Sequence, residues 1–316
     1  MKKFILSVAL TAALATPATA CDLCAIYSAN QARGDIGKGL FFGMAEQFTH
    51  FGTLQVDGHR VHNEVGQYLD SSVSQAFVGY NFNDRVGLQL NVPVIYRSFK
   101  RPEGFEIDRG TESGVGDVSL IGHFQVYRRQ TKRFTFSWSI LGGVKFPTGS
   151  TDRLKEELNE VEVPGAPESG IHGHDLTLGS GSVDGIVGTG IFLRSHRFFL
   201  TAGAQYTIRS KGDLDYRFAD DLTWLGGPGY FVVLKDEYTI ALALNVSGEH
   251  KERDRFRGER AEDTGVTAVY LGPQISFTWK DKLSAEVGVD LPVSIDNTAL
   301  QSIPDYRVRA GLTWHF

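Results

Sequence analysis

The sequence is poor in cysteine and methionine and lacks any long apolar run after its first residues. Two Cys and two Met occur among 316 residues, against 36 Gly, 21 Phe and 11 Tyr. Glycine and aromatic residues favour turns and strands over helices. Beyond residue 20 no segment approaches 18 continuous apolar residues, which excludes a membrane protein built of helices. A membrane barrel stays open, because its strands are apolar only at alternate positions.

The charge balance and the missing motifs exclude further classes. The formal net charge is -5 and no basic cluster is long, so we expect no nucleic-acid partner. No glycine-rich phosphate loop stands between a strand and a helix, and the glycines are interpreted as barrel glycines and turns. We therefore expect no bound cofactor.

Residues 1–20 have the three parts of a secretory signal peptide. Lys2 and Lys3 precede an apolar run that ends at Ala15, and small residues at 18–20 are typical of a cleavage site. The apolar run is too short to cross a bilayer. We expect the mature chain to begin at Cys21, in an oxidising compartment.

Cys21 and Cys24 open a predicted periplasmic segment, 21–39, that is a candidate plug for a barrel. A local disulfide is the first interpretation of the pair in an oxidising compartment. Lipid attachment at Cys21 and capture of a soft metal by both thiolates stay open. Ala18 stands where a lipoprotein signal usually has a large aliphatic residue, and no His follows Cys24, so covalent haem attachment is unsupported.

From residue 40 onward, apolar and polar residues alternate in recurring segments. Successive side chains of a strand point to opposite faces, so each segment predicts a strand with one apolar and one wetter face. One segment sets Phe134 and Phe136 against Thr135 and Ser137. We predict twelve strands, at about 40–57, 68–82, 86–97, 115–128, 134–146, 181–194, 198–208, 221–234, 238–247, 265–279, 283–295 and 306–316.

The connections between these strands alternate in length. Tight polar turns follow every even-numbered strand, whereas mostly longer, charged connections follow the odd-numbered ones, the longest at about 149–179. This asymmetry predicts an all-β fold over 40–316: a 12-stranded antiparallel transmembrane β-barrel with short periplasmic turns and longer extracellular loops. Aromatic residues gather at the predicted periplasmic strand ends, as suits the headgroup level. They are Phe82, Phe134, Phe198, Tyr238, Trp279, Trp314 and Phe316.

The last predicted strand alternates without a break up to Phe316. This pattern resembles the closing strand of bacterial outer-membrane barrels, a family in which the terminal residues are read by the barrel assembly machinery. The resemblance implies that Tyr306, Trp314 and Phe316 form an assembly signal. It also implies a place in the outer membrane of a Gram-negative bacterium, with outer-membrane lipid and the assembly machinery as partners.

Three glycine-rich stretches carry a second resemblance. They are GVGDVSL at 114–120, GGVKFPTG at 142–149 and GSGSVDG at 179–185. Together they resemble the Gly-Asp strand and the KxPTG strand end of the MetA-pathway phenol-degradation family. That resemblance implies an outer-membrane barrel of transporter type associated with small aromatic compounds, in a family without established catalytic residues.

Charged residues are predicted to line the lumen. By parity Asp117, Lys145 and Asp184 point inward near the outer ends of neighbouring strands, where they would pair or line an eyelet for a polar solute. Opposite charges recur on the last two strands, at Glu286, Asp290, Arg307 and Arg309. A lumen with both signs of charge passes small polar or zwitterionic solutes more readily than it selects one ion.

Histidines supply the remaining candidate chemistry. His172 and His174 in the longest loop can ligate a divalent metal if loops converge, but without a completing motif they are interpreted as solvated loop residues. His123 faces the lumen on the strand of Ser119 and Asp117, which permits a barrel hydrolase. Two-residue steps along a strand are roughly 7 Å apart, too far for direct proton relay.

We therefore predict no enzyme but a channel, through which small molecules diffuse passively and which the loop at 149–179 gates. The alternatives are a structural or binding barrel with a blocked lumen and, less favoured, the hydrolase with lumen Ser, His and Asp.

Overall fold

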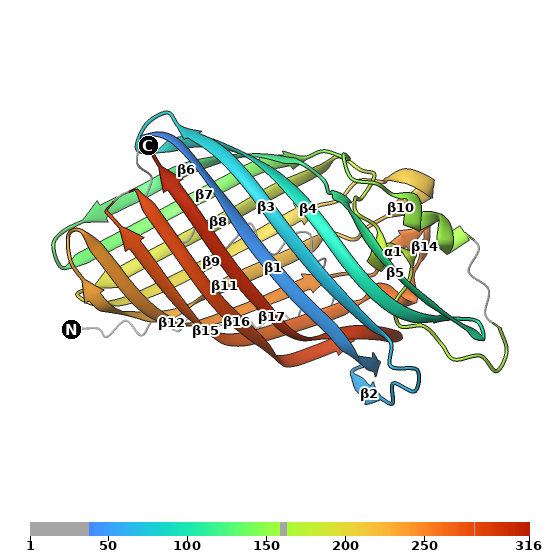
Figure 1. Ribbon diagram of the computed structural model, residues 1–316. Coiled ribbons are helices and arrows are strands. Elements are labelled where there is room, and N and C mark those ends of the chain that lie inside the picture. The colour runs from blue at the N-terminus through green and yellow to red at the C-terminus, as the bar shows by residue number, and fades with distance from the viewer. Residues whose placement is uncertain (1–37, 159–162, 281) are drawn as a thin grey trace, which may run out of the picture.

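Twelve strands of the described chain form a closed antiparallel wall in which the last strand pairs with the first (Figure 1). The computed structural model describes residues 38–158, 163–280 and 282–316. The wall consists of β1 (Gly39–Val56), β3 (Tyr68–Asn81), β4 (Val86–Glu103), β6 (Ser119–Gln130), β7 (Phe134–Lys145), β8 (Asp184–Ser195), β9 (Phe198–Ile208), β11 (Asp221–Leu234), β12 (Tyr238–Lys251), β15 (Val266–Trp279), β16 (Leu283–Asn297) and β17 (Leu300–His315). The predicted barrel is confirmed. The signal peptide, Cys21 and Cys24 lie outside the described residues.

The closing seam joins β17 to β1 along almost their whole length. The pairing runs from Phe41 opposite His315 to Val56 opposite Leu300, with register shifts next to Phe51. Because a closed wall leaves no free sheet edge in the hydrocarbon layer, every strand of the membrane-spanning part finds backbone partners.

Two predicted connections are wrong. We expected longer loops after the third and the eleventh strands, but β4 and β16 extend further than predicted and turn within two residues each, at 104–105 and 298–299. The alternation weakens beyond the membrane, where both faces of a hairpin meet water, so periodicity alone ended these strands too early.

A strand that the sequence did not predict, β5 (Glu106–Val115), continues β6 along the same neighbour. β4 pairs with β5 over its outer part and with β6 over its periplasmic part. The break between them falls at Gly116, where an added Cβ would lie 2.8 Å from Ile95 Cδ1 and 3.2 Å from the Leu178 carbonyl oxygen. Glycine is therefore needed where the wall breaks and the longest loop approaches it.

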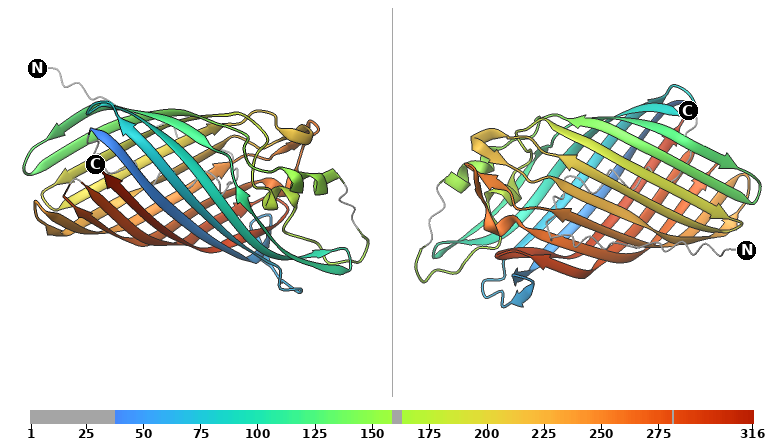
Figure 2. Two further views of the ribbon diagram at one scale, coloured as in Figure 1. Left: turned by 45° about the horizontal axis from the view of Figure 1, so that its top comes forward. Right: turned by 180° about the vertical axis from the view of Figure 1, so that it is seen from behind.

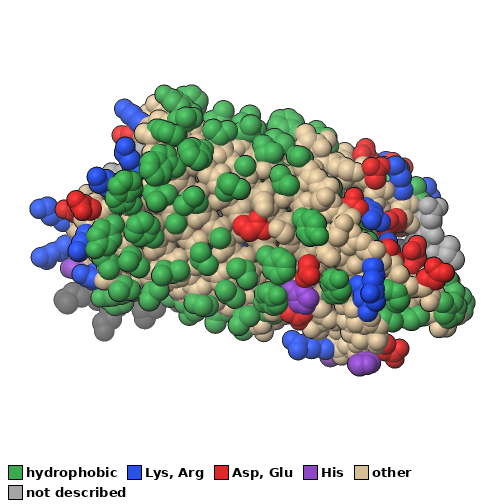
Figure 3. Space-filling view, viewed as in Figure 1, with side chains coloured by type: hydrophobic (Ala, Val, Ile, Leu, Met, Phe, Trp, Pro, Cys, Tyr) green, Lys and Arg blue, Asp and Glu red, His purple; other side chains and the backbone are tan. Residues whose placement is uncertain are grey.

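The outer surface of the wall is apolar. Figure 3 shows hydrophobic side chains over the barrel's flank and charged ones gathered mostly at its two ends. Exposed side chains recur at every second position, as in Leu40, Phe42 and Met44 of β1. Five of the seven predicted aromatic ends are exposed as well, with Phe198 at 68% and Phe316 at 66%, and Tyr238 and Trp314 are half-buried. Such a surface places the barrel in a bilayer.

Glu46 of β1 is an exception on this apolar flank. It shares the outward parity of Met44, and it accepts hydrogen bonds from the hydroxyls of Ser72 and Ser74 on β3. Carboxylates on the lipid face of a barrel are unfavourable. The two hydroxyls lower that cost because they replace part of the water that the carboxylate loses.

The loops at the outer end carry the small elements of the structure (Figure 2). They are β2 (His59–Val61), η2 (Asp152–Leu158), α1 (Gly173–Leu176), η3 (Asp213–Asp215), β10 (Tyr216–Arg217), β13 (Arg255–Phe256), β14 (Glu259–Arg260) and η4 (Glu262–Thr264). In the described chain no helix is long and apolar enough to cross a membrane. β10, β13 and β14 form a separate small sheet.

Candidate functional site

Asp117 joins the three glycine-rich stretches of the sequence at the outer end of the lumen. Its carboxylate accepts hydrogen bonds from Lys145 Nζ at 3.0 Å, from the Gly149 amide at 3.1 Å and from the Ser180 amide at 2.8 Å. The loop 146–183 leaves the wall after β7 and returns at β8, so this one side chain fastens both of its ends. Asp117 is 5% exposed.

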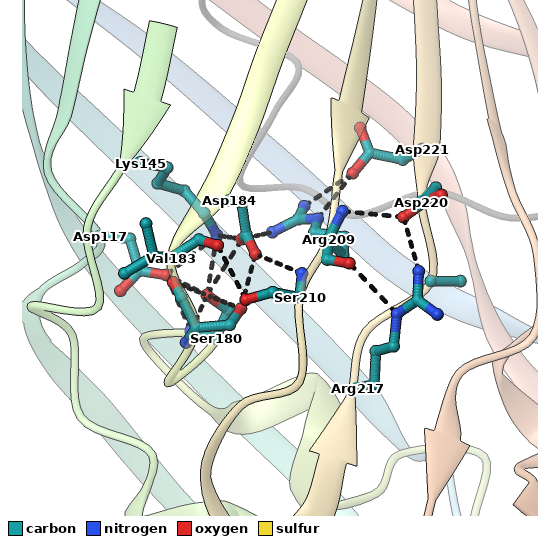
Figure 4. Close-up of polar contacts among 12 residues, drawn as sticks. Asp117, Lys145, Ser180, Val183, Asp184, Arg209, Ser210, Arg217, Asp220 and Asp221 are labelled. Atoms are coloured by element: carbon teal, nitrogen blue, oxygen red, sulfur yellow. Dashed lines mark hydrogen bonds and ion pairs between the residues drawn. The ribbon is translucent and has the colours of Figure 1, made fainter. Parts of the chain in front are cut away.

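The network continues along the wall through alternating charges (Figure 4). Lys145 Nζ lies 2.9 Å from Asp184 Oδ2, and that oxygen also lies 3.0 Å from an Arg209 guanidinium nitrogen. Arg209 reaches Asp221 of β11 at 2.7 Å. All of these side chains are buried. A buried charge is tolerated when it is paired and hydrogen-bonded, so the predicted pairing of Asp117, Lys145 and Asp184 is what the structure shows.

Two glycines let the ends of the loop touch. A Cβ on Gly149 would lie 2.6 Å from the Leu178 carbonyl oxygen, and one on Gly179 would lie 2.5 Å from the Gly149 carbonyl oxygen. Any other residue would push the two backbones apart and move the amides of Gly149 and Ser180 away from Asp117.

The same loop fills the outer half of the lumen with apolar side chains. Leu178 packs among inward-facing residues of β1, β3 and β4, including Val73 and Ile95. Leu176 and Ile171 pack on Phe99 in a second cluster. Arg97 of β4, 5% exposed, donates from one guanidinium nitrogen to the carbonyl oxygens of Asp175 and Thr177. We refer to residues 146–158 and 163–183, the described part of this loop, as the outer plug.

Further inside, two arginines of β17 line two different cavities. Arg309 lines a cavity of about 890 Å³ in the periplasmic half, and Arg307 lines one of about 100 Å³ beneath the outer plug. Arg309 Nε contacts Asp290 at 2.6 Å. Arg307 contacts Glu249 of β12 at 2.6 Å and lies 4.1 Å from the centre of the Tyr270 ring.

These contacts differ from simple neighbour pairing on the last two strands. Arg307 stands opposite Asp290 in the β16–β17 register, yet its guanidinium bonds with Glu249, which the sequence analysis did not single out. Glu286 accepts a hydrogen bond from Gln274 at 2.9 Å. Long side chains reach across the lumen, so strand register alone does not decide their partners.

The loop histidines are not solvated, contrary to our interpretation. His174 is 7% exposed, and its ring nitrogens lie 3.0 Å from Glu157 and 3.5 Å from Asp175. His172 stacks on it with ring centres 5.7 Å apart and lies 3.4 Å from Asp263 of the neighbouring loop. Among the residues that the structure describes, no group of three or more His, Cys, Asp or Glu could hold a metal ion.

The protonation states of His174 and Glu157 are decided by the charges around them rather than by burial. Burial by itself lowers the pKa of His174, but the carboxylates of Asp175 and Glu157 outweigh burial and raise the pKa well above its usual value of 6.5. Burial likewise raises the pKa of Glu157, and the imidazole of His174 outweighs it and lowers the pKa to about 2. The protonated histidine therefore fastens α1 to η2.

The three residues of the hydrolase alternative make other contacts. Asp117 binds the outer plug, Ser119 Oγ accepts from Asn91 at 3.2 Å, and His123 lies against Gly87, where an added Cβ would be 2.2 Å from the ring. A nucleophile and its base need hydrogen-bond contact, and these positions do not provide it.

Comparison with known proteins shows that this chain is similar to outer-membrane barrels in fold, at low sequence identity. No protein-family model matches the chain, and no curated protein matches it. The COG4313 outer membrane channel from Pseudomonas putida F1 superposes with a TM-score of 0.61 at 15% identity, over 89% of this chain and 97% of that one.

Two translocator barrels superpose less well. That of the autotransporter NalP from Neisseria meningitidis has a TM-score of 0.42 at 12% identity, over 89% of this chain and 90% of that one. The β domain of the Bordetella autotransporter BrkA has a TM-score of 0.44 at 8% identity, over 89% of this chain and all of that one. The chain has the fold of an outer-membrane β-barrel.

Proposed function

We propose that this barrel is an outer-membrane channel through which small molecules diffuse passively, with the outer plug as its gate. The observation that carries the proposal is the 890 Å³ cavity inside a closed wall, lined as far as the periplasmic turns by residues such as Lys132 and Lys235. A cavity of this size accommodates a small organic molecule. The outer plug fills the other half of the lumen, so passage requires its displacement.

The resemblance to the phenol-degradation family supports small aromatic compounds as one solute class, and the charged lumen supports polar ones. We propose no catalytic role, because Asp117, Ser119 and His123 make other contacts. We also propose that Tyr306, Trp314 and Phe316 serve as the signal for barrel assembly. Trp314 lies against Trp279 at the periplasmic end, with ring centres 6.2 Å apart.

A second candidate, a binding barrel with a permanently blocked lumen, is favoured by the apolar seat of Leu178 in the wall. Planar bilayers separate the two. We expect stepwise conductance from the folded protein, none from heat-denatured protein, and larger steps after residues 151–177 are replaced by a short linker. A silent wild type with a conducting deletion variant would support the blocked barrel, and silence of both would refute the channel.

A further inference from the structure

The large lumen cavity has an aromatic wall. Phe192 of β8, Phe199 of β9 and Phe231 of β11 all line it, and their ring centres lie 5.9 Å (Phe192 to Phe199) and 4.9 Å (Phe199 to Phe231) apart. The interior of a membrane barrel is ordinarily polar. Three adjoining phenylalanines on neighbouring strands therefore form a surface on which a flat apolar ring can stack.

Gly229 makes room for the central ring. A Cβ at this position of β11 would lie 2.1 Å from Phe199 Cζ. The ring of Phe199 thus lies across the backbone of the neighbouring strand, where Phe231 on the same strand extends the aromatic surface. Gly229 and Phe199 are register partners in the β9–β11 pairing.

Arg194 of β8 lies beside this aromatic wall. It lines the same cavity, it stands opposite Phe199 in the β8–β9 register, and Phe192 precedes it on the inward face of its own strand. Its guanidinium donates to Thr135 Oγ1 from Nη2 at 3.1 Å and from Nε at 3.4 Å, to the His196 carbonyl at 3.2 Å and to the Thr131 carbonyl at 3.3 Å. Within the described residues these partners are neutral.

Four lumen cations differ from Arg194 in this respect, whereas Arg97 is held by the carbonyl oxygens of the outer plug. Lys145, Arg209, Arg307 and Arg309 each contact a carboxylate at 3.0 Å or less. A guanidinium held by neutral oxygens keeps its full charge toward the cavity, and the second N–H of Nη1 is left to donate to a carboxylate.

The mouth of the cavity adds to the positive potential. Arg128, Lys132 and Lys235 line it near the periplasmic turns, where Asp236 also lines it, and Glu286 lies deeper inside. Excess positive charge in a confined opening raises the local concentration of anions.

We propose that this cavity is a binding site for small aromatic carboxylates, with the ring stacked on Phe199 between Phe192 and Phe231 and the carboxylate on Arg194. Benzoate is the simplest member of the class. The inference rests on the proposed channel function and adds to it a ligand class and the residues that recognise it. Passive diffusion through a channel needs no specific binding site, so this site goes beyond the proposed channel function.

Isothermal titration of the folded protein in detergent micelles with benzoate tests the site. We expect saturable binding, and weaker binding by at least about tenfold in Arg194→Gln, which loses a charge-assisted pair. Arg194→Lys keeps the positive charge but not the guanidinium geometry, so its affinity for benzoate is expected to lie between those of wild type and Arg194→Gln. Acetate is titrated for comparison. Phe199→Leu is expected to weaken the binding of benzoate more than the binding of acetate, since only benzoate has a ring to stack. Arg133→Gln removes a cation from the β6–β7 turn outside the cavity lining and is the matched control.

The outcomes separate the two proposals, because binding in micelles needs no open pore. Benzyl alcohol binding as tightly as benzoate, or Arg194→Gln and Arg133→Gln behaving alike, would refute the site. Conductance without benzoate binding refutes the binding site and leaves the channel function standing. Benzoate binding without conductance refutes the channel function and leaves the binding site standing. Folding of each variant is checked by the heat-dependent shift of barrels on gels, and Arg194→Lys carries the test if Arg194→Gln fails to fold.

Discussion

Lys145 at the outer end of the lumen contacts two carboxylates within 3.0 Å, whereas Arg194 near the periplasmic end donates to neutral oxygens among the described residues. The outer half is filled by the outer plug, and its charges are satisfied within the protein. The periplasmic half holds the large cavity. Paired charges hold structure together, and a charge left facing a cavity is available to a ligand. The outer half therefore suits the proposed gate, and the periplasmic half suits the proposed binding site.

The largest expected effect comes from removing the carboxylate that fastens the outer plug. Asp117→Ala leaves Lys145 and the amides of Gly149 and Ser180 with fewer acceptors, at a cost of about 3–5 kcal/mol for breaking a buried pair. We expect a multi-fold rise in bilayer conductance and faster trypsin cleavage after Arg153. Asp84→Ala, in the exposed β3–β4 turn, is the control. Unchanged conductance in Asp117→Ala would mean that the outer plug does not gate.

A smaller effect is expected from the apolar seat of the same loop. Leu178 is 3% exposed, and Leu178→Ala should destabilise the seated loop by about 2–5 kcal/mol through lost burial and a cavity. We expect conductance between that of wild type and Asp117→Ala. Leu158→Ala, at a side chain that is 37% exposed in η2, should match wild type. Equal effects of the two leucine variants would contradict a seated plug.

The pH dependence of the outer plug follows from His174. Its pKa is raised on folding, so its stabilising contribution is full below about pH 6.5 and is lost as the pH rises past the raised value. Glu157, whose pKa falls to about 2, contributes above its ordinary pKa near 4.5 and loses that contribution as the pH falls toward 2. The outer plug is expected to loosen at alkaline pH and at strongly acid pH.

Single-channel recordings across pH check this expectation. The groups facing His174 are Glu157 of η2, Asp175 and His172 of its own loop, Tyr216 of β10 and Asp263 of the neighbouring loop. We expect open probability to rise on the alkaline side in wild type and in His196→Gln, whose histidine lies in a periplasmic turn. His174→Gln should flatten the response above neutral pH. A flat wild-type profile would contradict the fastening role of the histidine.

The smallest effect is expected from charges at the mouth of the periplasmic half. Lys132→Gln or Lys235→Gln alone should lower the preference for anions by at most about fivefold, because an exposed charge contributes roughly 1 kcal/mol or less. Reversal potentials in a salt gradient measure it. Lys280→Gln, at a cation lying 5.3 Å from the Trp279 ring, is the control. Lys251→Gln breaks a buried pair with Asp254 in the outer half. A larger shift in reversal potential from this variant would contradict the assignment of anion preference to the periplasmic mouth.

Much of the wall could be predicted from the sequence. Strand β11 has the bounds that alternation gave, and the inward parity of Asp117, Lys145 and Asp184 is confirmed. The signal failed where strands leave the membrane, as in β5 and the outer parts of β4 and β17. Once water meets both faces, polar residues occupy both parities and the period of two disappears.

The site could be predicted only in part, for a different reason. Lumen charges were found by parity, but Glu249, Arg209 and Asp221 were missed because their partners lie on distant strands or across a loop. The aromatic wall was missed for the same reason. Phe192, Phe199 and Phe231 belong to three strands, and nothing local in the sequence shows that their rings meet.

The sequence by itself determined that the chain forms a barrel, which residues face lipid and which face the lumen, because alternation is a local property of each strand. The tertiary structure alone decided which lumen charges are paired, that the outer plug enters the outer half, and that Arg194 faces a cavity beside three phenylalanines. Those facts depend on register, strand neighbours and loop return, and they bring together residues that are far apart along the chain.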